Sequence, residues 1–192
     1  MNILFLSLID FESIRQKGIY TDLLQQMEQM GHCIYAVSPF ERRKGGTTRL
    51  ISEGERVKIL KVKIGNSQKT NLLEKGISTI LLEHQIKTAI KKQFGEITFD
   101  MVLYSTPPIT FEKVISYVKR KDSKKQTVSY LMLKDIFPQN AVDLGMFGKK
   151  SPFYFYFRRK EQKLYQISDY IGCMSSENPR YLLAHNPGVK KE

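Results

Sequence analysis

Short apolar runs alternate along the chain with longer segments in which apolar residues recur at helical spacing. Runs bounded by turn-forming residues predict about six strands, at residues 3–9, 32–38, 56–64, 99–104, 126–133 and 169–174. Apolar positions at the period of a helix predict amphipathic helices between them, at residues 19–30, 71–94, 109–121, from 152 onward and at 179–184. This alternation predicts an α/β fold with one doubly wound, mostly parallel, Rossmann-like sheet.

Two segments deviate from the simple alternation. Residues 39–54 are polar and basic, and they predict a loop. Residues 56–64 read RVKILKVKI, where basic and apolar positions alternate with the period of a strand that is exposed on one face. We therefore expect this strand near a sheet edge, with its lysines outward, where they discourage edge pairing.

Four loops follow predicted strands and would converge at one edge of such a sheet, at residues 10–18, 105–108, 134–140 and 175–178. Ligands bind outside the carboxyl ends of parallel strands, so these loops are candidates for a site. Lys134 and Asp135 are the leading pair, because they directly follow an apolar strand and precede Pro138, which forces the chain to turn. A surface ion pair is the competing interpretation of these two residues.

The candidate loops offer groups suited to an anionic or hydroxyl-bearing ligand. Gly18 and the helix start at Ser176 present backbone amides, which attract negative charge. Lys134 adds a positive point charge, and Asp135 can orient a hydroxyl or act as a base. The sequence has no GxSxG, Walker A or HExxH motif and no Cys/His ligand spacing. Hydrolase, P-loop nucleotidase and metalloenzyme functions therefore lack support.

Composition and charge indicate the cellular compartment of the protein and the kinds of partner that it can attract. The 192 residues include 31 basic and 19 acidic ones, a formal charge of +12, which attracts phosphates, nucleic acid or anionic lipid without choosing among them. Cys33 and Cys173 lie far apart in apolar segments and predict two buried thiols in a reducing compartment, with no metal site. The apolar N-terminus lacks a basic n-region and predicts a strand, and no segment is long enough to span a membrane. We expect a cytoplasmic protein.

An unusual segment at residues 147–163 combines aromatic and basic residues. Ser151 as N-cap and Pro152 at the first helical position predict a helix start, followed by five consecutive aromatic residues and then a basic stretch. Aromatic side chains beside cations suit an interfacial helix on an anionic membrane, with Lys149, Lys150, Phe153, Arg158 and Arg159 as docking residues. Alternatively, the aromatic stripe packs on the sheet as core and the basic residues are only solvated.

Five segments, in order, resemble one known family. They are MNILFLS with its Gly-bearing loop, GHCIYAVSP, FDMVLYSTPP, LKDIFPQNAVDLGM and DYIGCMSSENPRYLLAHNP. Together they are similar to the N-terminal half of a family 4 glycosyltransferase of GT-B fold, especially of the bacterial enzymes that assemble capsule, O-antigen and related polysaccharides. LKDIFPQ and DYIGCMS are the most specific parts. The family often has paired glycines after the first strand and a histidine after the strand at 99–104, where this chain has Gly18 alone and Ser105 with Thr106.

The resemblance implies two Rossmann-like domains that face each other across a cleft. Residues 1–192 would form the acceptor-side domain, and the donor-binding domain would be absent, so the chain alone should be inactive. The implied reaction is retaining transfer of a sugar from a nucleotide-sugar donor to a lipid-linked glycan acceptor, without metal or cofactor. Charge stabilisation would be the main catalytic device.

The resemblance also implies roles for individual residues. Lys134 and Asp135 would lie in the cleft as catalytic residues, and Gly18 would approach the donor phosphates. Acceptor-binding residues would be Ser105, Thr106, Gln139, Ser176 and Glu177. The protein would then work on the cytoplasmic face of the plasma membrane, as a peripheral protein.

Two other interpretations remain at the level of sequence. A basic α/β module could bind nucleic acid or another anionic partner, but no RNP, KH or helix-turn-helix signature occurs, so nucleic acid is not an expected partner. The chain could also be a subunit that pairs with a separately encoded donor-binding half.

Overall fold

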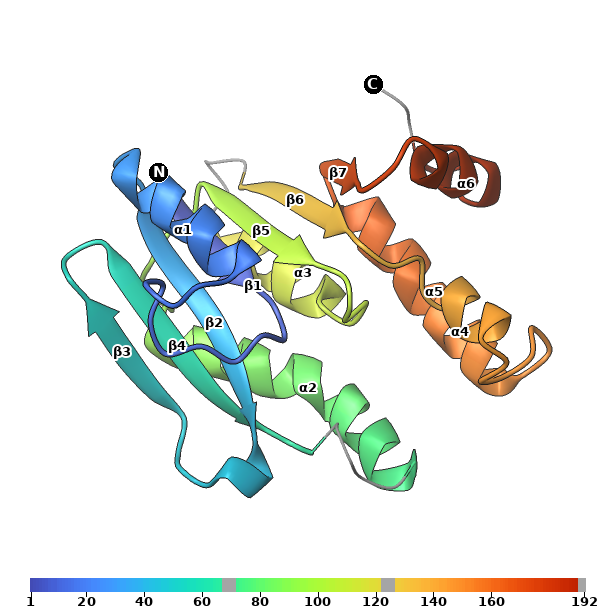
Figure 1. Cartoon of the computed structure of the whole chain (residues 1–192), viewed down its shortest axis with the longest axis horizontal. Helices are drawn as coiled ribbons and strands as arrows, with labels where there is room; N and C mark the ends of the chain where they lie inside the picture. Colours follow the sequence, from blue (N-terminus) through green and yellow to red (C-terminus); the bar gives the residue numbers. More distant parts are fainter. Residues whose placement is uncertain (67–71, 122–126, 190–192) are drawn as a thin grey trace.

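A seven-stranded sheet with helices on both faces organises the part of the chain that the computed structural model describes (Figure 1). Described are residues 1–66, 72–121 and 127–189, with side chains of residues 72–77, 79 and 80 excepted. The strands are β1 (Asn2–Leu6), β2 (Cys33–Glu41), β3 (Arg49–Glu53), β4 (Val57–Ile64), β5 (Met101–Ser105), β6 (Val128–Leu133) and β7 (Tyr170–Cys173). The helices are α1 (Ile19–Gln29), α2 (Leu72–Gln93), α3 (Glu112–Lys121), α4 (Gln139–Asp143), α5 (Pro152–Ile167) and α6 (Glu177–His185), with a 3₁₀ turn, η1 (Arg42–Lys44).

The strand order is β3-β4-β2-β1-β5-β6-β7, and every neighbouring pair except β3 with β4 is parallel. The chain moves from β1 to one side of the sheet, then crosses through α2 from β4 to β5 and continues to the other side. This reversal is the switch point of a doubly wound sheet, which lies next to β1. The predicted fold class is confirmed.

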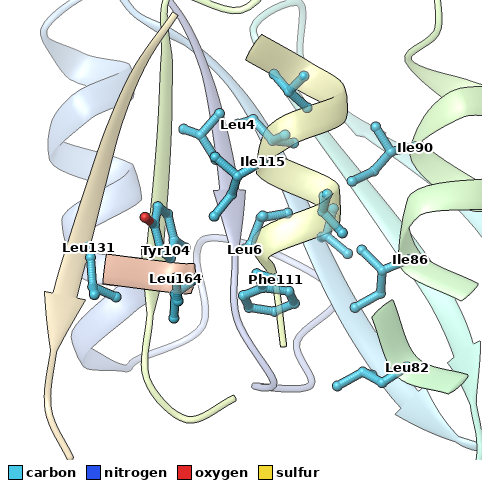
Figure 2. Close-up of a cluster of buried hydrophobic side chains, with 14 of the residues drawn as sticks. Leu4, Leu6, Leu82, Ile86, Ile90, Tyr104, Phe111, Ile115, Leu131 and Leu164 are labelled. Carbon is cyan, nitrogen blue, oxygen red and sulfur yellow. The ribbon is translucent and has the colours of Figure 1, made fainter. Parts of the chain in front are cut away.

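The central strands are buried on both faces, because successive side chains of a strand point to opposite sides. In β1, Ile3 and Phe5 belong to the core beneath α1, while Leu4 and Leu6 belong to the core on the other face. Figure 2 shows this second core, in which strand residues meet side chains from α2, α3 and α5; it labels Leu4, Leu6, Leu82, Ile86, Ile90, Tyr104, Phe111, Ile115, Leu131 and Leu164.

The prediction of a loop at residues 39–54 is wrong in part. The strand β2 continues to Glu41, and Arg49–Glu53 forms β3, which pairs antiparallel with β4 through Leu50↔Leu60 and Ile51↔Ile59. Its residues are mostly exposed or half-buried, so no apolar run marked it. Gly54, at φ +67, provides the left-handed conformation in the turn between the two strands. The sheet therefore has seven strands, one more than expected.

The expectation of outward lysines on residues 56–64 is also wrong for one of them. The alternation changes phase at Leu60, so Val57, Ile59 and Lys61 share the face beneath α1 while Leu60 and Val62 face the opposite core. Lys61 is 1% exposed. Pairing with β3 places β4 one strand inside the edge. Its two faces are buried because the β1–α1 loop covers one of them and α2 covers the other.

The remaining elements lie close to their predicted positions. Ser151 caps α5, since its Oγ accepts a hydrogen bond from Phe153 N at 3.2 Å, as predicted. The short helix α4 was not expected, and α6 begins at Glu177, slightly earlier than predicted. The predicted starts of elements at Asn71 and Gln126 lie outside the described residues. Among the described helices, none has the length and apolar character needed to cross a membrane.

Candidate functional site

Thr106 joins the carboxyl ends of β5 and β6. Its backbone N–H donates to Met132 O at 3.2 Å, and its Oγ1 accepts hydrogen bonds from Lys134 N at 3.0 Å and Asp135 N at 3.4 Å. The side chain is 1% exposed. This hydroxyl fixes the direction in which the chain leaves β6. Ser105 is buried as well, so both hydroxyls predicted to bind an acceptor lie beneath the surface here.

Lys134 connects this edge to the start of α1. Its Nζ lies 4.1 Å from the centroid of the Tyr20 ring, a cation–π geometry. Tyr20 itself is held by Phe5, whose ring centroid is 5.3 Å away. No carboxylate among the described residues contacts Nζ of Lys134, which contradicts the surface ion pair considered for Lys134 and Asp135. The cation is therefore positioned but not neutralised.

Gly18 is the N-cap residue of α1, two positions before Tyr20. Its backbone is extended, with φ 169, and a Cβ at this position would lie 3.0 Å from Thr21 Oγ1, which donates to Gly18 O. Close packing of Thr21 thus accounts for a small residue here. The structure brings the helix start at Gly18, Thr106, Lys134 and Asp135 to one edge of the sheet, and the approach of a donor phosphate to Gly18 stays a prediction.

Two buried acceptors lie at the start of α4. Oε1 of Gln139 and Oδ1 of Asn140 accept no hydrogen bond within the described part of the chain, although Nε2 of Gln139 donates to Asp143 at 2.7 Å. Asp135, a few residues upstream, is exposed. Unpaired buried acceptors are uncommon, so this turn combines an exposed carboxylate with amide oxygens that lack a donor.

Ser176 and Glu177 follow β7, one strand further along the same edge. Both are exposed, and Glu177 Oε1 pairs with Arg180 at 2.9 Å. Ser176 makes no capping hydrogen bond; Ser175 Oγ accepts from Asn178 N at 3.4 Å instead. Acceptor binding by Ser176 and Glu177 stays a prediction.

A second polar cluster, which sequence reasoning missed, surrounds Lys61. Its Nζ forms an ion pair with Asp10 and donates to Phe11 O at 3.0 Å and Ser38 Oγ at 3.1 Å. Lys44 Nζ approaches the other oxygen of Asp10 at 2.5 Å. Burial raises the pKa of the Asp10 carboxyl, but the hydrogen bonds from Lys44 and Lys61 outweigh it and hold this pKa below its ordinary value. The cluster fixes the β1–α1 loop against β2 and β4.

This cluster borders an open cavity of about 310 Å³ beside the β1–α1 loop, lined by Asp10, Glu12, Phe40, Lys44, Gly45, Gly46, Arg49 and Lys61. Arg49 pairs with Glu12, and both lysines pair with Asp10. The charges in its wall are thus paired internally. The change of phase at Leu60 was the one sequence signal that could have revealed the buried lysine.

Arg158 does not have the surface role predicted for it. Its side chain is 19% exposed, forms an ion pair with the buried carboxylate of Glu161 and donates to His185 O. It therefore connects α5 to the end of α6. The other predicted docking residues, Lys149, Lys150, Phe153 and Arg159, are all exposed.

The Thr106→Val substitution is expected to destabilise the protein by about 1–3 kcal/mol, because it leaves two backbone N–H groups at the end of β6 without an acceptor. Urea unfolding of the parent and the variant measures the difference. Thr106→Ser, which keeps the hydroxyl, is the matched control and should lose less unfolding free energy than Thr106→Val. A valine variant as stable as the parent would show that these bonds do not hold the loop.

The described residues do not form a ligand set for a metal ion. Within residues 1–66, 72–121 and 127–189, no group of three His, Cys, Asp or Glu side chains is arranged to hold an ion. Both cysteines are free and half-buried, not fully buried as expected. The chemistry available at this edge is that of Lys134, Asp135, the amide side chains of α4 and the N-terminus of α1.

Comparison with known proteins places the fold. No protein-family model and no curated protein matches the sequence. Among solved structures, the chain is similar to "Trehalose-6-phosphate from E. coli bound with UDP-2-fluoro glucose" (TM-score 0.60, 8% identity, 95% of this chain and 42% of that one). It is similar also to "OtsA apo structure" (TM-score 0.59, 8% identity, 96% of this chain and 42% of that one). Both are structures of a glycosyltransferase of GT-B fold. At such low identity the likeness establishes the fold alone: the chain has the Rossmann-like fold of a GT-B domain.

Proposed function

We propose that the chain is the N-terminal, acceptor-side domain of a two-domain glycosyltransferase. The observation that carries the proposal is the match of the fold over 95% of the chain to a structure of more than twice its length. The chain spans 42% of that neighbour. The neighbour's title names a bound nucleotide sugar, UDP-2-fluoro glucose. In the proposal, a second domain binds most of the nucleotide-sugar donor, and these 192 residues form the opposite wall of the cleft.

The finer part of the proposal rests on the resemblance of LKDIFPQ and DYIGCMS to family 4 enzymes of the capsule and O-antigen type. It specifies retaining transfer to a hydroxyl of a lipid-linked glycan at the cytoplasmic face of the plasma membrane. A cation binds phosphate groups such as those of this acceptor, and Lys134 is a positioned cation without a carboxylate partner among the described residues. Asp135 is exposed and is available to accept a hydrogen bond, or the proton, of the reacting hydroxyl.

Other residues at the edge would support these two. Gln139 and Asn140 have buried amide oxygens that lack a donor among the described residues, and such oxygens can accept hydrogen bonds from sugar hydroxyls. Thr106 acts as a positioning residue through its two hydrogen bonds to the Lys134–Asp135 backbone. Ser105 is buried beside it. Direct contact with the acceptor is therefore proposed for Lys134, Asp135 and Gln139.

The test is to measure binding and transfer with the isolated chain. We expect it to bind a detergent-solubilised polyprenyl-diphosphate-linked sugar, to bind UDP-sugars weakly or not at all, and to transfer no sugar. Lys134→Met should weaken acceptor binding about tenfold or more, the effect of losing one charge-assisted hydrogen bond. Lys91→Met, at an exposed lysine of α2, is the matched control.

Two results would contradict the proposal. Sugar transfer by the isolated chain would show that no second domain is needed. Equal acceptor binding by the parent and Lys134→Met would remove this edge as the acceptor site.

A further inference from the structure

The connection between α4 and α5 and the N-terminal end of α5 carry large apolar side chains that the fold leaves in solvent. Leu144 is 76% exposed, Met146 62%, Phe153 66%, Phe155 63% and Tyr156 40%. We call these five residues the apolar tip. In Figure 1 this connection and the N-terminal end of α5 project from the body at the right of the view. Single apolar residues are normal on a surface, but larger exposed groups of them mark interaction sites.

Packing of α5 does not account for the tip. The inward face of the helix consists of Phe157, Glu161, Leu164 and Tyr165, which are buried or packed against the core. Phe157 contacts Phe137, with ring centroids 5.0 Å apart. The alternative in which the aromatic stripe is core thus holds for Phe157 and Leu164 but not for Phe153 or Phe155. These two phenylalanines are therefore mostly exposed and contribute little buried surface to the domain.

Basic residues surround the tip. Lys149 and Lys150 lie in the turn before α5, and Arg159 and Lys163 lie on the exposed side of the helix. None of these four side chains is in an ion pair with a described residue. Asp143 is the exposed acid nearest in sequence, and it accepts a hydrogen bond from Gln139. The tip therefore combines exposed apolar area with uncompensated positive charge.

We propose that the apolar tip inserts into the headgroup region of an anionic membrane, with Lys149, Lys150 and Arg159 contacting lipid phosphates. Aromatic and aliphatic side chains bind the interface by burial, and cations bind it by charge, and stable attachment generally needs both. The overall charge of +12 adds long-range attraction in the same sense. A protein partner fits less well, because lysine is depleted in protein interfaces and aromatic anchors there meet complementary pockets.

The first experiment is co-sedimentation with phosphatidylcholine vesicles, with and without about one-third phosphatidylglycerol. The parent should bind the anionic vesicles at low salt and lose most binding at high salt. Lys149→Gln/Lys150→Gln/Arg159→Gln should bind about a hundredfold more weakly, since each cation near an anionic surface contributes about fivefold. The matched control, Lys91→Gln/Lys92→Gln/Arg120→Gln, removes equal charge from exposed positions near the ends of α2 and α3.

The second experiment uses the absence of tryptophan from the chain. Phe153→Trp places one fluorophore in the tip, and Met30→Trp places one at a position that is 73% exposed at the end of α1. Anionic vesicles should shift the emission of the first variant to the blue and leave that of the second unchanged. Phe153→Ser/Phe155→Ser should abolish binding without lowering thermal stability, because both side chains are already exposed.

Three outcomes would overturn the proposal: no binding of the parent to anionic vesicles at low salt, equal loss in the tip and control charge variants, or an unshifted Phe153→Trp emission. If the tip instead docks a protein, vesicle binding will be unaffected by the tip substitutions, which also overturns it. The inference requires no catalytic activity, so vesicle binding and sugar transfer can fail separately.

Discussion

Lys61→Ala is expected to lower the free energy of unfolding by about 3 kcal/mol, because it removes one of the two cations that pair with the Asp10 carboxylate and a charged donor from Phe11 O and Ser38 Oγ. Nζ of Lys61 makes three contacts, to Asp10, Phe11 O and Ser38 Oγ, which use the three N–H bonds of an ammonium group. Asp10 keeps Lys44 as a partner, so the loss should stay below that of a fully isolated buried charge.

Urea unfolding at neutral pH measures this effect. Lys58→Ala and Lys63→Ala, at half-exposed lysines of the same strand, are matched controls and should change stability by about 0.5 kcal/mol or less. If Lys61→Ala lowers the free energy of unfolding no more than the two control variants do, the β1–α1 loop does not depend on the contacts of Lys61.

Acid should reduce the difference between the parent and a Lys61→Met variant. The pKa of Asp10 is lowered in the folded protein, so its contribution to stability is complete above its unfolded pKa of about 3.9. That contribution is lost as the pH falls through the lower, folded pKa. The parent therefore has more stability to lose below this range than the variant, in which one of the two stabilising cations is gone.

Arg158→Met is expected to destabilise the protein by about 3 kcal/mol at neutral pH, because it leaves the buried carboxylate of Glu161 without its cation. Glu161 is 2% exposed and also accepts a hydrogen bond from Tyr165 OH at 2.8 Å. Burial raises the pKa of Glu161 even with Arg158 beside it. Without the arginine, burial would raise it further.

The pH dependence of this loss has a defined sign. A carboxyl whose pKa is raised in the folded state binds more protons there than in the unfolded state. The destabilisation caused by burying its charged form therefore disappears as the pH falls through the folded pKa. The loss of unfolding free energy in Arg158→Met should therefore become smaller on acidification. At neutral pH, Arg158→Met/Glu161→Gln should regain much of the lost stability. Arg159→Met, at the exposed neighbour, is the control. An equal deficit at neutral and acid pH would argue that lost packing, not charge, causes it.

The features predicted correctly depend on short stretches of sequence. Ser151 followed by Pro152 defines the start of α5 by local chemistry alone, and the structure has that cap. Apolar runs identified most strands because buried strands need apolar residues on both faces. Convergence of Thr106, Lys134 and the start of α1 followed from parallel topology, since all parallel strands end at one edge.

The features that were missed depend on what packs against them. Whether Lys61 is buried depends on the β1–α1 loop, which covers that face of β4 and supplies Asp10 and Phe11 O to Nζ, and nothing within residues 56–64 specifies that cover. Arg158 and Arg159 are adjacent identical residues, yet one pairs with buried Glu161 and the other is exposed. Only the rotation of α5 on the sheet separates them, and that rotation follows from side chains on other elements.

The central place of β1 has a consequence for synthesis of the protein. Asn2 and Asp100 are bonded across the β1–β5 boundary although 98 residues separate them. At about 5–20 residues per second, translation leaves one edge of nascent β1 unpaired for roughly 5–20 seconds after β1 itself is made. Strands β2 and β4 can meanwhile complete the other half of the sheet. An apolar strand with one free edge is a template for pairing with other chains. We therefore expect the growing chain to be most prone to aggregation during that interval.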